Sequence, residues 1–159
     1  MAIIKISKTP IPYEEALANM EQYVEQIYKE NAADKIWLLE HPEIYTAGVS
    51  ANDDDLLNKN IKLIKTGRGG KITYHGPGIR IIYVMINLKR RKSCDIKKYI
   101  ADLENWIIKT LAEFGIKGEI RKDRVGIWVS NNDNIENKIA AIGVRAVSYT
   151  HLTLPTIPG

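Results

Sequence analysis

Four glycines within one eleven-residue segment constrain the fold of this chain more than any other feature of its sequence. The segment, residues 68–78, reads RGGKITYHGPG. Glycine adopts backbone conformations that other residues avoid, and it lets the backbone approach a ligand closely because it has no Cβ. An arginine and a histidine beside such a backbone can bind an anion or carry protons. The segment therefore predicts two tight turns around a short strand, with plain hairpin turns of no function as the alternative.

The composition is that of one ordinary globular domain. The chain has 159 residues, of which 45% are hydrophobic and 26% charged, so it is long enough to bury a core. Its net charge of +4 permits an acidic partner. The single cysteine, Cys94, excludes an internal disulfide and fits a reducing compartment. Because no apolar run approaches the roughly 18 residues that cross a bilayer, we expect a cytoplasmic protein without membrane association.

Hydrophobic periodicity predicts an α+β fold with a mostly antiparallel or mixed sheet and packed helices. The helices are expected at residues 12–30 and 95–114. Asp95 should cap the start of the second helix, Gly115 should end it, and Trp106 and Phe114 should belong to its apolar stripe. The strands are expected at residues 3–6, 35–40, around Ile61 and Leu63, and at 71–74, 79–88, 116–121, 125–130 and 138–144, with a hairpin turn at 131–134.

Residues 146–159 follow neither the helical nor the strand period. Two prolines and many small or hydroxyl-bearing residues make up this segment, which resembles the translated read-through of a sequencing adapter. A natural, loosely structured C-terminus is the alternative. We therefore expect a domain over residues 1–145 and a non-native tail over residues 146–159.

Four blocks in order along the chain resemble the lipoyl (octanoyl) transferase family. They are residues 37–48, 68–78, 123–129 and 138–145. The resemblance implies the fold of the biotin and lipoate ligase catalytic module, here incomplete at its C-terminal end. It also implies transfer of an octanoyl group from octanoyl-acyl carrier protein to a lysine of a lipoyl domain in lipoate biosynthesis, without a cofactor. The acceptors would be the lipoyl domains of 2-oxoacid dehydrogenase E2 subunits and the glycine cleavage H protein.

The same resemblance implies one catalytic lysine and a set of pocket residues. The lysine is Lys138, which would lower the pKa of a catalytic cysteine. The pocket residues are Arg68, Gly69, Gly70, Lys71, Ile72, Thr73, Tyr74, His75, Ala141, Ile142 and Gly143. The family places its cysteine further on, in a Pro-Cys-Gly motif that this sequence lacks, and Cys94 is far from that position. Ile79 stands where the family usually has glutamine.

The chemistry of acyl transfer explains why such residues would be needed. A thiolate attacks a thioester better than a thiol does, and a nearby ammonium favours the charged sulfur. A lysine in a partly desolvated pocket can also take a proton from the incoming amine. Backbone N–H groups of the glycine turns are candidate donors to the oxyanion of the tetrahedral intermediate. Most lysines are merely solvated, and only its place at the start of the fourth block singles out Lys138 as the predicted catalytic group.

Two other functions stay open at this point. One is an ATP-dependent lipoate or biotin protein ligase, and the other is an inactive module that binds an acyl carrier protein or a lipoyl domain. The basic run at residues 89–92, with Lys97 and Lys98, is either a solvated face or a docking surface for acidic carriers. No nucleic-acid motif accompanies these charges. The three histidines and one cysteine lack metal-ligand spacing, so no metal is expected.

Overall fold

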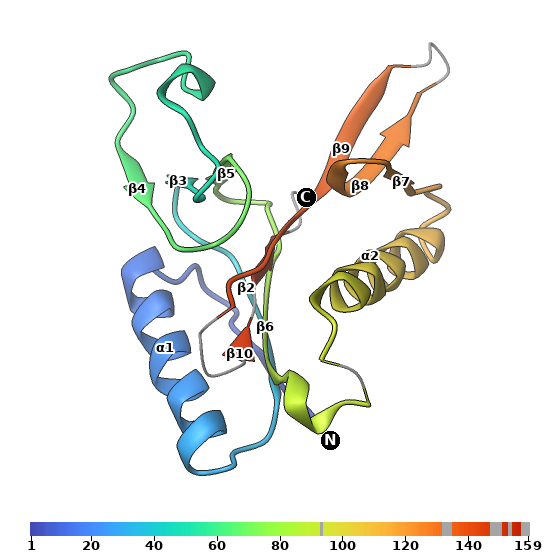
Figure 1. The fold of residues 1–159 in the computed structure, drawn as a ribbon. Coiled ribbons are helices and arrows are strands. Elements are labelled where there is room, and N and C mark those ends of the chain that lie inside the picture. The colour runs from blue at the N-terminus through green and yellow to red at the C-terminus, as the bar shows by residue number, and fades with distance from the viewer. Residues whose placement is uncertain (93, 132–134, 147–150, 153, 157–159) are drawn as a thin grey trace.

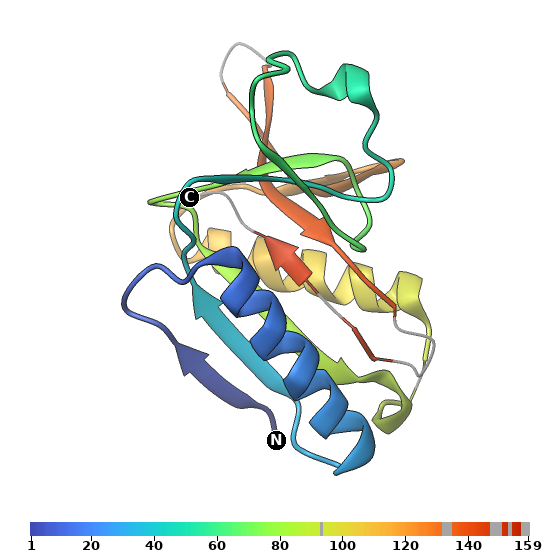
Figure 2. The same cartoon turned by 90° about the vertical axis from the view of Figure 1, so that its left-hand side faces the viewer.

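The computed structural model describes residues 1–92, 94–131, 135–146, 151–152 and 154–156. Within these residues two long helices lie on opposite sides of a twisted sheet, as Figure 1 shows. The helices are α1 (Tyr13–Lys29) and α2 (Ile96–Ala112). A smaller sheet sits beyond one end of the larger one, and the arrangement confirms the predicted α+β fold (Figure 2).

The larger sheet is mixed, because β1 and β2 are parallel while the other neighbours are antiparallel. Its order is β1 (Ile3–Ile6), β2 (Lys35–Leu39), β6 (Ile81–Asn87), β11 (Leu154–Thr156), β9 (Glu136–Gly143), β8 (Arg124–Ser130) and β7 (Glu119–Arg121), and β10 (His151–Leu152) also pairs with β6. The predicted turn at 131–134 falls between β8 and β9, and residues 132–134 lie outside the described residues.

The smaller sheet has the order β4 (Leu63–Lys65), β3 (Ile44–Ala47) and β5 (Ile72–His75). β3 runs parallel to β4 and antiparallel to β5. Two short 3₁₀ turns, η1 (Asp53–Asp55) and η2 (Leu88–Arg90), complete the elements. The sequence analysis did not predict β3, because four residues without a polar–apolar alternation carry little periodic signal.

The central strand β6 joins the two halves of the core, because its alternate side chains point to opposite faces of the sheet. Ile81, Tyr83 and Met85 pack against α1. Ile82, Val84 and Ile86 belong to the cluster that α2 covers. This two-sided burial accounts for the continuous apolar run of the strand.

The caps predicted for the second helix are present, but its apolar stripe is shorter than predicted. The Asp95 carboxylate accepts hydrogen bonds from the amides of Lys97 and Lys98, and Gly115 has a φ of +71°. The prediction was wrong for Phe114, which lies past the end of α2 and is 76% exposed. Trp106, which was also predicted for the stripe, is 39% exposed.

Parts of the segment 146–159 form strands of the larger sheet. β11 lies between β6 and β9, pairing Thr156 with Ile81 and Leu154 with Gly143. Residues 147–150, 153 and 157–159 of this segment lie outside the described residues. The domain boundary at residue 145 stays a prediction. Among the described helices, none combines the length and the apolar character needed to span a membrane.

Candidate functional site

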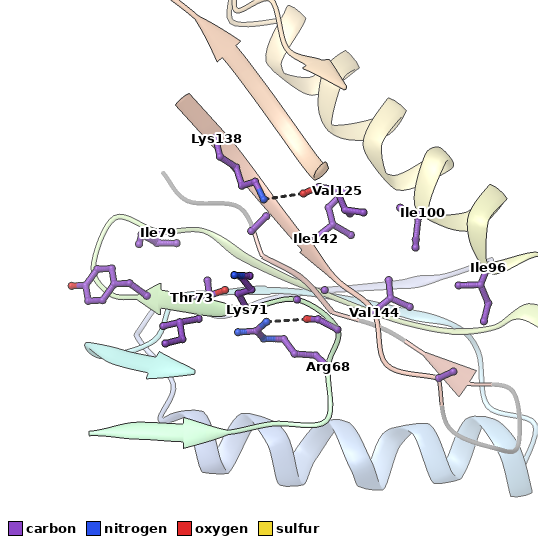
Figure 3. Close-up of a pocket in the computed structure, with 17 residues that line it drawn as sticks. Arg68, Lys71, Thr73, Ile79, Ile96, Ile100, Val125, Lys138, Ile142 and Val144 are labelled. Carbon is purple, nitrogen blue, oxygen red and sulfur yellow. Dashed lines mark hydrogen bonds between the residues drawn. The ribbon is translucent and has the colours of Figure 1, made fainter. Parts of the chain in front are cut away.

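A cavity of about 690 Å³ lies where the glycine segment, the end of β9 and the start of α2 meet. We call residues 68–71 of this segment the glycine loop. Figure 3 shows the side chains that surround the cavity, with Arg68 on one side and Lys138 on the other. All predicted pocket residues except His75 line it, as does Lys138. Lining residues that the sequence analysis did not predict are Ile79, Ile96, Ile100, Val125, Val144 and Ala146.

The glycine loop keeps its position through close backbone contacts. A Cβ on Gly48, at the end of β3, would lie only 2.2 Å from the carbonyl oxygen of Gly70, so the two segments can touch only at glycine. Gly70 itself has a φ of +88°, a conformation that favours glycine. The amide of Gly69 donates a 3.0 Å hydrogen bond to the carbonyl oxygen of Val144, which connects the loop to the strand end opposite.

The Arg68 side chain holds the glycine loop from beneath. Its guanidinium is buried and donates hydrogen bonds to the carbonyl oxygen of Gly69 and to both oxygens of Thr46. Burial lowers the pKa of this guanidinium from its usual value. In the part of the chain that the structure describes, no carboxylate forms an ion pair with Arg68. The hydrogen bonds of Arg68 therefore connect the glycine loop, which forms part of the cavity wall, to β3.

His75 lies behind the cavity rather than in its lining. The side chain is 2% exposed, and its Nε2 lies 3.0 Å from Thr46 Oγ1. Burial, helped by the nearby His41 and Arg68, lowers the pKa of His75 to about 3. The imidazole is therefore neutral at physiological pH, and it sits where it supports β5 instead of exchanging protons with a ligand.

His41 is a buried neighbour of His75 that the sequence analysis did not single out. Its Nδ1 lies 2.6 Å from the carbonyl oxygen of Ile11, so this nitrogen donates. Its Nε2 therefore accepts from the hydroxyl of Tyr83, at 2.6 Å. Burial lowers the pKa of His41 and raises that of Tyr83, so both groups stay neutral. No pattern in the sequence pairs these three distant segments.

Lys138 brings an amine to the cavity from β9. Its Nζ donates a 2.9 Å hydrogen bond to the carbonyl oxygen of Val125, and Figure 3 shows this contact at one end of the cavity. Desolvation, and then the charge of Arg124, lower the pKa of Lys138 from its usual value. A lowered pKa makes the neutral amine easier to form, so this group can act as a base or, when charged, attract an anion.

Two further polar side chains of the lining, those of Lys71 and Tyr74, are engaged with carboxylates. The ammonium of Lys71 pairs with the carboxylate of Asp55 at 2.6 Å, and the hydroxyl of Tyr74 donates to Glu43. The inner wall is therefore mainly apolar, with aliphatic side chains from β5, α2, β9 and the residue that follows β9. These are Ile72, Ile96, Ile100, Ile142 and Val144. Such a lining suits a ligand with a hydrocarbon body.

Neither a thiol nor a metal site accompanies the cavity in the described residues. Cys94 is exposed, and its Sγ donates to the carbonyl oxygen of Leu88 at 3.5 Å instead of lining the cavity. No group of three or more His, Cys, Asp or Glu side chains among the described residues is arranged to hold a metal ion. The chemistry available at the cavity is therefore that of Lys138 and of backbone amides.

The sequence profile of the lipoyl protein ligase A/B catalytic domain matches residues 12–156. An octanoyltransferase of Wolbachia pipientis wMel is 52% identical over 156 residues, which span 96% of this chain and 76% of that protein. The chain belongs to the octanoyltransferase family. A further octanoyltransferase, from Parvibaculum lavamentivorans, is 54% identical over 145 residues, covering 89% of this chain and 64% of its own length. These matches confirm the family that the four sequence blocks predict.

The fold of this chain is shared with solved lipoate protein ligases. The bi-partite lipoate protein ligase of Thermoplasma acidophilum matches with a TM-score of 0.65 at 15% identity, over 99% of this chain and 60% of the ligase chain. A lipoate-protein ligase A bound with ATP matches with a TM-score of 0.64 at 16% identity, and the chain spans 66% of it. At such low identity the likeness describes the fold alone, and it confirms the predicted ligase-like module.

Proposed function

We propose that this chain carries the acyl-binding site of an octanoyltransferase that acts in lipoate biosynthesis. The reaction moves an octanoyl group from acyl carrier protein to the amine of a lysine on a lipoyl domain. The observation that carries the proposal is the combination of an apolar cavity with the amine of Lys138 at one end. No metal or nucleotide is required for this chemistry.

The cavity fits the hydrocarbon part of the substrate. Its volume of about 690 Å³ leaves room for an eight-carbon chain together with the start of a carrier arm. Burying each methylene contributes about 0.8 kcal/mol, so contact with the isoleucine-rich wall is sufficient to hold the chain. Ile72 and Ile142 come from different sheets, and they enclose the acyl group from two sides.

The transfer step needs a nucleophile, which we assign to a cysteine thiol that these 159 residues do not supply at the cavity. The Lys138 ammonium would favour the thiolate and would give its proton to the departing carrier thiolate, and the resulting neutral amine would then take the proton from the acceptor lysine. Gly69 already uses its amide on Val144. Gly70 and Lys71, whose amides lack a backbone acceptor among the described residues, are the proposed donors to the oxyanion.

The partners of the proposed reaction are acyl carrier protein as donor and lipoyl domains as acceptors. The acceptors would be those of 2-oxoacid dehydrogenase E2 subunits and of the glycine cleavage H protein, in the cytoplasm. A basic surface attracts acidic carriers and raises the rate of encounter. Arg90 and Arg91 are tied to Asp34, while Lys89 and Lys92 remain exposed for such contacts.

Calorimetric titration with octanoyl-pantetheine tests the proposed acyl site. We expect saturable binding that Ala141→Phe abolishes, because the ring would fill the cavity beside Ile142. Ala112→Phe adds the same bulk at an exposed position of α2 and should leave binding unchanged.

The ligase alternative is examined in parallel by incubating the protein with octanoate and ATP. Octanoyl-adenylate formation would favour the ligase, and a folded wild type that does not bind the thioester would refute the acyl site.

A further inference from the structure

One peptide unit beside the cavity connects Lys138 to a buried carboxylate. The Nζ of Lys138 donates to the carbonyl oxygen of Val125 at 2.9 Å, and the adjoining amide of Gly126 donates to Glu104 Oε1 at 3.2 Å. In a trans peptide the C=O and N–H groups point in opposite directions. The ammonium and the carboxylate therefore polarise the same peptide in the same sense, which strengthens both hydrogen bonds.

Gly126 gives this peptide its orientation. Its φ is +117°, and a Cβ at this position would lie 2.5 Å from the carbonyl oxygen of Ala140. The pairing of β8 with β9 also shifts register directly afterwards, between Ile127 and Trp128. The backbone here is thus built so that one peptide can face β9 with its oxygen and α2 with its amide.

Glu104 is unusual among the acidic residues of α2 because it faces the core. It is 6% exposed and lies in the helix between the buried Leu103 and Ile107. No lysine, arginine or histidine of the described residues forms an ion pair with it, and its hydrogen bond comes from the Gly126 amide. Because a buried carboxylate without an ion pair is unfavourable for folding, packing alone does not account for this residue.

We propose that Glu104 is a positioning residue that holds the ammonium of Lys138 at the cavity through the Val125–Gly126 peptide. The inference rests on the proposed function, in which Lys138 assists acyl transfer. Glu104 touches neither the substrate nor Lys138 directly. It acts by polarising and fixing the carbonyl group to which the lysine is bound.

The other charged groups around Lys138 do not duplicate this contact. Arg124 on β8 lowers the pKa of Lys138, so it opposes the charged form. Glu136 on β9 is engaged by Arg121 and Arg124. The ring of Trp128 lies 5.0 Å from the lysine Nζ, which adds a weaker cation–π attraction. Across the cavity, the ammonium of Lys71 is paired with Asp55.

The experiment measures how fast Lys138 is acetylated by limiting acetic anhydride between about pH 7 and about pH 10, with each lysine read by mass spectrometry. Glu104→Gln keeps the shape and can still accept from Gly126, but it removes the charge. Because this loss disfavours the ammonium, we expect Lys138 in the folded variant to react about threefold faster at neutral pH. Glu113→Gln removes a charge from an exposed site at the end of the same helix and should change nothing.

If Glu104→Gln does not fold, a second variant, Glu104→Asp, is compared with the wild type. Glu104→Asp keeps the charge on a side chain one methylene shorter, so it should raise the labelling rate by a smaller factor. A folded Glu104→Gln with the labelling profile of the wild type would overturn the inference, because a purely structural role predicts that result. If the wild-type protein does not bind octanoyl-pantetheine, the proposed function is refuted. The comparison of Lys138 labelling between the wild type and the Glu104 variants would still test the positioning role.

Discussion

The guanidinium of Arg68 donates to both oxygens of Thr46, at 2.7 Å to the hydroxyl and 3.0 Å to the carbonyl. The Thr46 hydroxyl also lies 3.0 Å from Nε2 of His75. Since Arg68 can only donate, the Thr46 hydroxyl oxygen accepts from it, and the same hydroxyl is within hydrogen-bond distance of the imidazole. One buried hydroxyl thus links the glycine loop, β3 and β5 beneath the cavity.

Thr46→Val should destabilise the fold by about 1–3 kcal/mol, because it leaves a buried guanidinium hydrogen and an imidazole nitrogen without their partner. Valine has nearly the same shape, so the loss reports the hydrogen bonds and not a cavity. Urea unfolding followed by circular dichroism measures the difference. Thr110→Val, at an exposed position of α2, serves as the control and should stay within about 0.5 kcal/mol of the wild type. Equal midpoints for the two variants would contradict the assigned role.

The buried histidines predict a loss of stability in mild acid. Burial lowers the pKa of His75 from 6.5 to about 3, and it lowers that of His41 as well. The folded protein therefore binds fewer protons than the unfolded chain. The stabilising contribution is complete above about pH 6.5 and is lost as the pH falls toward 3. The protonation of His75 should cost about 1.4 kcal/mol per pH unit within this window.

Urea midpoints measured from about pH 7.5 to about pH 4.5 check the acid dependence, with His75→Gln as the comparison. The variant should show a shallower decline than the wild type, since one group that resists protonation has been removed. Carboxylates titrate equally in both proteins, so the difference between the two curves isolates His75. Parallel curves would mean that this imidazole accepts a proton in the folded state without penalty.

The sequence analysis predicted the caps of α2 correctly, because a short segment of the chain determines such features by itself. Asp95 and Gly115 cap α2 as predicted, because capping depends on a few neighbouring residues. The prediction that Phe114 belongs to the apolar stripe was wrong because the helix ends before this residue. The apolar spacing continues past the end of the helix only by chance. The strand β3 was missed because its four residues lack a polar–apolar alternation.

The candidate site could be predicted only in part, because its residues come together through tertiary contacts. The family resemblance pointed to Lys138 and to the glycine loop, and the structure brings both to one cavity. The Glu104 carboxylate and the ring of His41 carry no motif. Their importance lies in burial and in hydrogen bonds to distant segments, so no spacing in the sequence could have identified them.

Gly48→Ala should destabilise the protein by roughly 1–3 kcal/mol, because the added methyl group would overlap two carbonyl oxygens of the glycine loop. Gly69→Ala is the matched comparison: a Cβ there meets nothing closer than 3.5 Å. Thermal unfolding of both variants gives the difference in stability. A Gly48→Ala protein as stable as Gly69→Ala would show that β3 and the loop do not need their close approach.

These 159 residues should not transfer octanoyl groups by themselves, because the one cysteine is exposed and lies outside the cavity lining. Without a thiol at the cavity no acyl-enzyme can form there, and Lys138 has no sulfur to activate. Intact mass spectrometry after incubation with octanoyl-acyl carrier protein and an apo lipoyl domain follows both the chain and the acceptor. The Wolbachia octanoyltransferase is the positive control, and Cys94→Ser should behave as the wild type does. Acceptor octanoylation by the wild type that Cys94→Ser abolishes would instead identify Cys94 as the nucleophile and overturn the assignment of an external thiol.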